Sequence, residues 1–185
     1  MTRLLIVDRY DSSQVSVDED PKDDDAYAGL AEAYVEARVM GFQASQTELS
    51  GEARAAAQRA IALDGRSADG YLALAQNDMD DWQFGAAGTE YRRSVDLNPN
   101  LATAHEGYAV FLNFTGRFNE AFEQDQRALE LDPTGSLANA WLGMIYYFQR
   151  DYGRSIAQNQ QTLEINPELC RSVSHHDQLL LGRTR

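Results

Sequence analysis

The sequence of 185 residues has a single cysteine and no long hydrophobic run, and both shortages exclude classes of protein. Cys170 cannot form an internal disulfide, and one cysteine leaves no cysteine framework for a metal ion. The longest apolar run near the start, Leu4 to Val7, is far shorter than a signal peptide or a membrane span requires. We therefore expect a cytoplasmic protein that does not enter a membrane.

Basic residues are also scarce. The 16 Lys and Arg residues face 29 Asp and Glu residues, which gives a formal net charge of −13. Nucleic-acid binding depends on Lys and Arg displacing counterions from phosphates, so we expect no direct contact with DNA or RNA. Two interpretations of the acidity remain open. It favours solubility, or it attracts a basic segment of a partner.

Motifs of catalysis are missing from the chain as well. It contains no GxSxG, no glycine loop for phosphate and no His–carboxylate spacing typical of a metal site. His175 and His176 are adjacent, so on a helix they would point about 100° apart and could not converge on one ion. We expect neither an enzyme activity nor a bound cofactor or metal.

What the sequence does contain is one recurring spacing. Four short segments place an apolar residue before Asp or Asn and then Pro or Gly, a combination that stops and turns a helix. Such a period predicts stacked helical units rather than one irregular domain. The segments are IALDG (61–65), VDLNP (95–99), LELDP (129–133) and LEINP (163–167), and their last residues are 34 positions apart.

Two kinds of packing position recur with the same period. Nine residues after a stop, a large apolar residue precedes a small one, and twelve residues before each stop lies another small residue. Small residues let neighbouring helices approach closely, while the large ones fill the gap between them. These positions are Leu74–Ala75, Tyr108–Ala109 and Leu142–Gly143, and Ala53, Ala87, Ala121 and Ser155.

Aligned in this way, residues 24–167 resemble the tetratricopeptide repeat, with its pattern W-x2-L-G-x2-Y, A-x3-F and P over 34 residues. The resemblance implies an all-α fold, a right-handed superhelical α-solenoid of about four antiparallel helix pairs. The phenylalanine position of the last two repeats holds Asp125 and Asn159, so we expect looser packing there. The expected repeats are 24–65, 66–99, 100–133 and 134–167, with helices near 24–39, 51–63, 67–79, 84–97, 101–114, 118–131, 135–148 and 152–165.

The first repeat and the two ends depart from the pattern. Ten extra residues near Met40 to Ser50 are expected to lengthen the loop within the first repeat. Pro21 stands in phase with the later stops, so the acidic residues 1–23 form either a degenerate helix that caps the array or a charged tail. Residues 168–185 are expected to be a C-terminal cap or tail.

Tetratricopeptide arrays line their concave face with the first helix of each pair, and this resemblance implies a groove that grades from acidic to aromatic. The acidic end would carry Asp25, Glu32 and Glu36. Aromatic and Met side chains at the other end are typical binding anchors, which a partner, the C-terminal tail or a second copy could cover. The expected partner-binding residues are Leu72, Gln76, Met79, Val110, Asn113, Phe114, Trp141, Met144, Tyr147 and Phe148.

The resemblance implies a non-enzymatic scaffold that binds a peptide or helix of a partner, with a basic and apolar segment as the expected ligand. Family members that bind acidic chaperone tails carry Lys, Asn and Arg in the groove, whereas this chain has residues such as Glu32, Gln76 and Glu106 there.

Two further interpretations concern the setting in which the repeats work. The stretches AYAGLAEAY (26–34) and DDWQFGAAGTEYRRSVDLNPNLATAHEGYAVFL (80–112) are similar to the repeat region behind winged-helix heads of bacterial one-component regulators. That similarity implies a sensing or docking module of a bacterial regulatory system. The alternative function is a self-associating structural module, so a homo-oligomer remains open.

Overall fold

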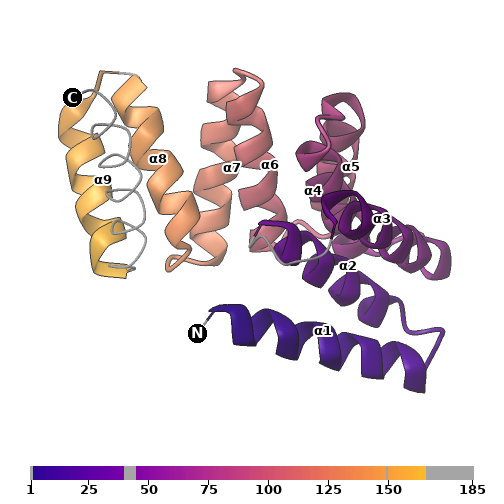
Figure 1. Ribbon diagram of the computed structural model, residues 1–185. Coiled ribbons are helices and arrows are strands. Elements are labelled where there is room, and N and C mark those ends of the chain that lie inside the picture. The colour runs from indigo at the N-terminus through magenta and orange to yellow at the C-terminus, as the bar shows by residue number, and fades with distance from the viewer. Residues whose placement is uncertain (1, 40–44, 149, 166–185) are drawn as a thin grey trace, which may run out of the picture.

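A computed structural model describes residues 2–39, 45–148 and 150–165. These residues form α-helices and turns and contain no strand. The helices lie side by side in chain order, from α9 at one end of the molecule to α1 at the other (Figure 1). Their bounds are α1 Thr2–Glu19, α2 Asp24–Val39, α3 Gln46–Leu63, α4 Ala68–Asp80, α5 Phe84–Leu97, α6 Ala102–Phe114, α7 Phe118–Leu131, α8 Ser136–Phe148 and α9 Tyr152–Ile165.

The helices pack as a repeating array. The pairs α2 with α3, α4 with α5, α6 with α7 and α8 with α9 are in contact, and the second helix of each pair also touches the first helix of the next. The first helices form a layer of their own, because α2 contacts α4, α4 contacts α6 and α6 contacts α8. The expected all-α solenoid of helix pairs is confirmed, whereas the expected C-terminal cap at 168–185 lies outside the described residues.

The helix boundaries follow the stop signals closely. Helices α5 and α7 end at Leu97 and Leu131, two residues before a proline that cannot continue the helix. At the start of α4, the Ser67 hydroxyl accepts a hydrogen bond from the backbone N–H of Gly70 at 3.3 Å. This bond satisfies one of the backbone donors that a helix leaves unpaired at its first turn.

Helix α3 starts earlier than the sequence predicted. The expectation was that the ten extra residues would lengthen a loop and that this helix would start near residue 51, but α3 begins at Gln46. The cause is a capping sequence, in which the Glu48 carboxylate accepts the backbone N–H of Ser45 at 3.4 Å. Part of the insertion therefore extends a helix, and the prediction of a purely longer loop was wrong.

Residues 2–19 form a helix that packs on α2. The rings of Tyr10 and Tyr34 meet edge to face, 5.4 Å between centroids, and Val17 is buried against the cluster that holds Leu30 and Ala31. Helix α1 ends before Pro21, in phase with the other second helices. It covers a side of α2 that would otherwise be the open end of the array, as a terminal helix of a solenoid does.

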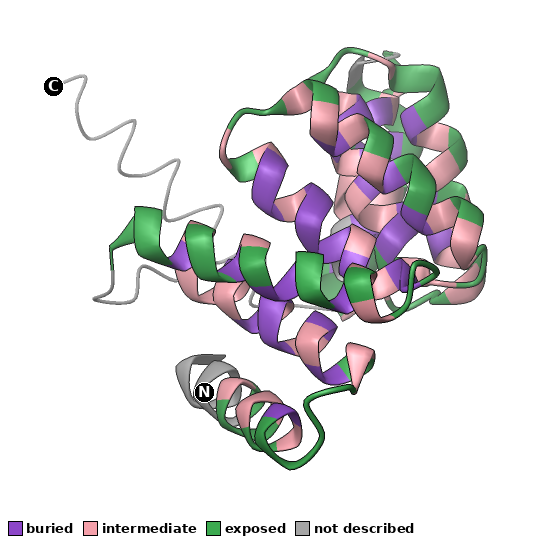
Figure 2. Cartoon of the chain, turned by 90° about the vertical axis from the view of Figure 1, so that its right-hand side faces the viewer, coloured by how far each residue is buried: buried purple, intermediate pink, exposed green. Residues whose placement is uncertain are grey.

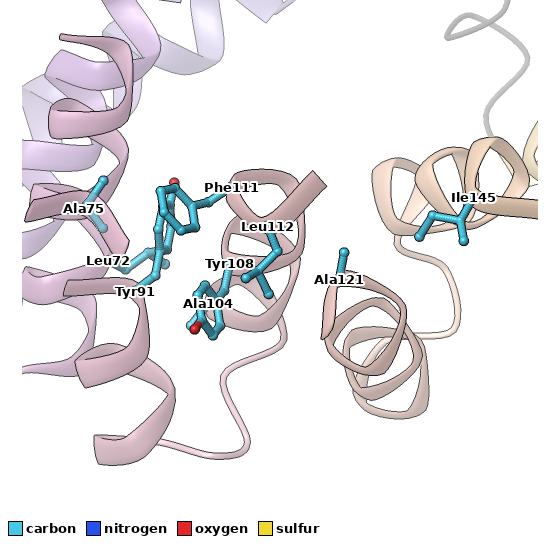
Figure 3. Close-up of a cluster of buried hydrophobic side chains, with 10 residues drawn as sticks. Leu72, Ala75, Tyr91, Ala104, Tyr108, Phe111, Leu112, Ala121 and Ile145 are labelled. Carbon is cyan, nitrogen blue, oxygen red and sulfur yellow. The ribbon is translucent and has the colours of Figure 1, made fainter. Parts of the chain in front are cut away.

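The main core lies between repeats rather than within one of them. Tyr91 from α5 stacks on Tyr108 from α6 at 6.1 Å between ring centroids, and Phe111 lies 5.8 Å from Tyr91 (Figure 3). Glycine makes this approach possible, because a Cβ at Gly107 would lie 2.8 Å from the Tyr91 ring. Figure 2 shows the buried residues of the described helices on the sides that face neighbouring helices.

The packing expected to loosen after this core shows a chemical difference. Tyr91 is 2% exposed and fills its position with a ring, whereas Asp125 holds the corresponding position of the next repeat and is 0% exposed. Neither carboxylate oxygen of Asp125 has a hydrogen-bond partner among the described residues. Burial, followed by the nearby Glu106 carboxylate, raises the pKa of Asp125 to about 8.

Candidate functional site

The layer formed by α2, α4, α6 and α8, here called the first-helix layer, carries most of the residues that the sequence assigned to a binding groove. Large apolar side chains are exposed where α6 and α8 end. Phe114 is 62% exposed, Met144 37% and Tyr147 58%. The Phe114 ring meets the Trp141 ring edge to face at 6.0 Å, which joins two successive repeats into one surface. We call Phe114, Trp141, Met144 and Tyr147 the aromatic patch.

The remaining predicted groove residues are less accessible. Gln76, Met79, Val110, Asn113 and Trp141 are half-buried. Their exposed portions lie on the same layer as the aromatic patch, so they can add contacts to a ligand that the patch anchors.

Two predicted groove residues need a separate statement. Leu72 is 1% exposed and belongs to the core cluster with Tyr91 and Leu112, so its side chain stabilises the array and is closed to a ligand. The phase of the helix placed it on the inner face, but packing between α4 and α6 buries it there. Phe148 is the last residue of α8, and its side chain lies outside the described part of the chain.

The acidic end of the layer is partly neutralised by α1. The Arg9 guanidinium lies 3.4 Å from the Glu32 carboxylate and 2.8 Å from that of Glu36. Burial raises the pKa of Glu32, and the positive charge of Arg9 partly offsets that rise. Burial and the negative charge of Asp25 also raise the pKa of Asp69. Crowded carboxylates of this kind favour a cation brought by a ligand.

Glu106 has a structural partner that its groove position did not reveal. Its carboxylate accepts a hydrogen bond from the backbone N–H of Ala138 at 3.0 Å, in the first turn of α8. An acidic group is favourable at a helix N-terminus, where backbone donors are unpaired. Glu106 therefore ties α6 to α8 and is not available as a simple ligand contact.

The turn inside each repeat adds a feature that sequence reasoning missed. Trp82, Gly116 and Arg150 lie 34 residues apart and share a positive φ, of 61°, 77° and 61°. Glycine tolerates this left-handed backbone, whereas a bulky residue is strained there. Gly116 was the available signal, because counting back one period reaches Trp82.

Trp82 is also one wall of an apolar pocket. The indole is 78% exposed and meets the Phe84 ring edge to face at 5.7 Å. The pocket is lined by Met79, Asp80, Trp82, Phe84 and Phe114, so it continues from the aromatic patch through the shared Phe114. Neither Trp82 nor Phe84 was among the predicted site residues.

Other kinds of site were sought in the same part of the chain. Within residues 2–39, 45–148 and 150–165, no group of three or more His, Cys, Asp or Glu side chains is placed to hold a metal ion. Among the described helices, none combines the length and the apolar character needed to cross a membrane.

Comparison with known proteins gives a fold but no close relative. No family model and no curated protein matches the sequence. Among solved structures, TTC0263, a thermophilic TPR protein of Thermus thermophilus, is 20% identical with a TM-score of 0.71, and the match covers 97% of this chain and 95% of that one.

Two further structures support the same fold. YrrB, a TPR protein with an unusual peptide-binding site, is 19% identical with a TM-score of 0.61 over 95% of this chain and 86% of that one. MamA is 17% identical with a TM-score of 0.63 over 88% and 89%. Together with the period of 34 residues, these matches show that the chain has the fold of tetratricopeptide repeat proteins.

Proposed function

We propose that this chain is a non-enzymatic scaffold that holds a peptide or a helix of a partner protein on its first-helix layer. The observation that carries the proposal is the aromatic patch. Large apolar side chains that remain this exposed in a folded chain usually mark an interaction surface, and aromatic and Met residues are favoured as its anchors. The peptide-binding site named for YrrB supports a peptide as ligand by analogy of fold alone.

The partner segment proposed here is basic as well as apolar. The chain carries a formal net charge of −13, and the pKa values of Glu32 and Asp69 are raised because burial disfavours their charged forms. Lys or Arg of a ligand near these groups would relieve that cost. The similarity of residues 26–34 and 80–112 to the repeats of bacterial winged-helix regulators supports a sensing or docking role in such a system.

The experiment selects ligands from a displayed library of random peptides of about 12 residues, long enough to span several contacts on the layer. The Trp141→Ala and Met144→Ala double variant is expected to bind the enriched peptides about tenfold or more weakly, as loss of anchor residues does. Its helical circular dichroism should be unchanged. Equal affinities of the variant and the wild type would contradict the proposal.

A matched control uses exposed apolar residues of a second helix. Ile156 and Leu163 of α9 are 59% and 43% exposed, and they lie outside the first-helix layer. Ile156→Ala and Leu163→Ala together should leave peptide affinity unchanged. A loss equal to that of the patch variant would show that binding does not depend on the first-helix layer.

The second candidate function is self-association, which the same aromatic patch favours. A second copy would then cover the patch in place of a foreign partner. Light scattering over a dilution series separates the two, since self-association makes the mean mass depend on concentration. A monomeric mass at every concentration would exclude this candidate.

A further inference from the structure

The turn that carries Trp82 is fixed by the same backbone bonds in three repeats. The N–H of Gln83 donates to the carbonyl of Asp78 at 2.8 Å, and the N–H groups of Arg117 and Asp151 make the corresponding bonds at 2.9 Å, one and two periods later. These bonds close the end of a helix around one residue of left-handed backbone. The turn therefore imposes a positive φ on Trp82, where glycine would be unstrained.

The strain at Trp82 brings no packing in return, because the indole is 78% exposed. Strained backbone that the surrounding structure enforces tends to occur where a side chain must be presented to a ligand. Here the ring is presented beside Phe84 and Phe114, and Phe114 is itself 62% exposed. These rings and Met79 form three apolar walls of a pocket that we call the Trp82 pocket.

The remaining wall of the Trp82 pocket is the carboxylate of Asp80. The nearby cations are occupied elsewhere: Arg38 pairs with Asp81 at 2.8 Å, and Arg54 pairs with Asp78. Within the part of the chain that the structure describes, no ion pair or hydrogen bond is formed by the Asp80 side chain. The pocket thus combines apolar walls with one acidic group that lacks a bonded cation.

We infer that the Trp82 pocket receives an apolar side chain of a partner peptide whose neighbouring Lys or Arg pairs with Asp80. This inference rests on the proposed function, and it names where one anchor of the peptide binds and what chemistry it has. A second copy of this chain is the less favoured occupant, because the approach of another chain of net charge −13 is opposed by repulsion.

The test uses peptides selected on the wild-type protein and labels the two tryptophans, Trp82 and Trp141, with 5-fluorotryptophan. Each tryptophan gives one fluorine resonance, and the Trp82→Gly variant assigns them. Peptides that carry Lys or Arg beside an apolar residue are expected to shift the Trp82 resonance. No enrichment of such peptides, or an unshifted Trp82 resonance at saturation, would overturn the inference.

Affinity measurements complete the test with variants of the pocket. Trp82→Gly should weaken binding about tenfold although it relaxes the turn, and Asp80→Asn should reduce the dependence of affinity on salt. Arg150→Gly is the matched control, because it makes the same change at the same turn of another repeat and should leave affinity unchanged. Unaltered affinity of Trp82→Gly would overturn the inference.

Two outcomes separate this inference from the proposed function. Peptides that shift only the Trp141 resonance, and that lose affinity only in the Trp141→Ala and Met144→Ala variant, would preserve the scaffold function and refute the Trp82 pocket. A wild-type dimer that Trp82→Gly dissociates would also refute it, because the pocket would then be occupied by a second copy.

Discussion

Trp82 and Gly116 occupy the same turn of successive repeats, with φ angles of 61° and 77°. The turn suits glycine, because a Cβ is disfavoured in left-handed backbone. Replacing Trp82 or Arg150 by Gly should therefore raise the free energy of unfolding by about 1 kcal/mol, the strain relieved less the entropy that glycine loses on folding. Urea unfolding measures the change.

The opposite substitution at the glycine provides the control. Gly116→Ala has open space for its Cβ, so steric contact with neighbours does not contribute to its effect. It should lower the free energy of unfolding by about 1 kcal/mol through backbone strain alone. Unchanged stability in all three variants would show that the turn is not strained.

Asp125 should make the protein less stable as pH rises. Its pKa is raised to about 8 in the folded state by burial and by Glu106, whereas an unfolded Asp titrates near its ordinary value of about 3.9. Between these values the folded state binds more protons than the unfolded state, so stability is highest below about pH 4 and falls up to about pH 8. Asp125→Asn should remove this decline, which amounts to about 1.4 kcal/mol per pH unit.

The measurement is urea unfolding of the wild type and Asp125→Asn at pH 5 and pH 7. Asp96→Asn serves as the control, because Asp96 is an exposed carboxylate of α5 and its removal should leave the pH dependence unchanged. The same difference between the two pH values in the wild type and in Asp125→Asn would contradict the account of a buried, unpaired carboxyl.

Arg54 should be important for stability because its partner is buried. The Asp78 side chain is 2% exposed and pairs with the Arg54 guanidinium. Arg54→Ala leaves a buried carboxylate without that cation and should cost about 3 kcal/mol, whereas removal of both charges in Arg54→Leu with Asp78→Leu should cost less. Thermal and urea unfolding would reveal the difference.

An exposed ion pair supplies the comparison for Arg54. Arg127 and Glu130 are 39% and 66% exposed and lie 3.0 Å apart on α7. Arg127→Ala should change stability by less than about 1 kcal/mol, since water solvates both charges. Equal costs for Arg54→Ala and Arg127→Ala would show that burial of Asp78 has no energetic consequence.

Binding of a basic peptide should tighten as pH rises above the ordinary range of carboxyl groups. The pKa values of Glu32, Asp69 and Asp80 are raised, chiefly by burial, so part of each group is protonated in mildly acidic solution. A bound cation lowers these pKa values, and binding therefore releases protons. Calorimetry in buffers of different ionisation enthalpy measures the release, and affinity that is independent of pH would contradict it.

The sequence predicted the array because its signals are local. A stop such as Asn98–Pro99 and the small residues at packing positions fix helix ends without reference to the rest of the fold, and α5, α7 and α9 have the predicted bounds. Helix α3 was misplaced at its start because the Ser45–Glu48 cap was overlooked.

The candidate site was less predictable because its details depend on neighbouring repeats. Helical phase places Leu72 and Glu106 on the inner face, but contacts across repeats bury the first and bond the second to the start of α8. The contact of Arg9 with Glu36 joins residues 27 positions apart, and no periodic pattern reports it. The exposed part of the aromatic patch follows from phase, because its helices have no further layer over them among the described residues.

The central claim is that a partner segment binds on the first-helix layer, and mapping of backbone amide NMR shifts during titration with a selected peptide tests it most directly. The account predicts the largest shifts in α6 and α8, at Val110, Phe114 and Met144. Shifts confined to the second helices α5, α7 and α9 would contradict it.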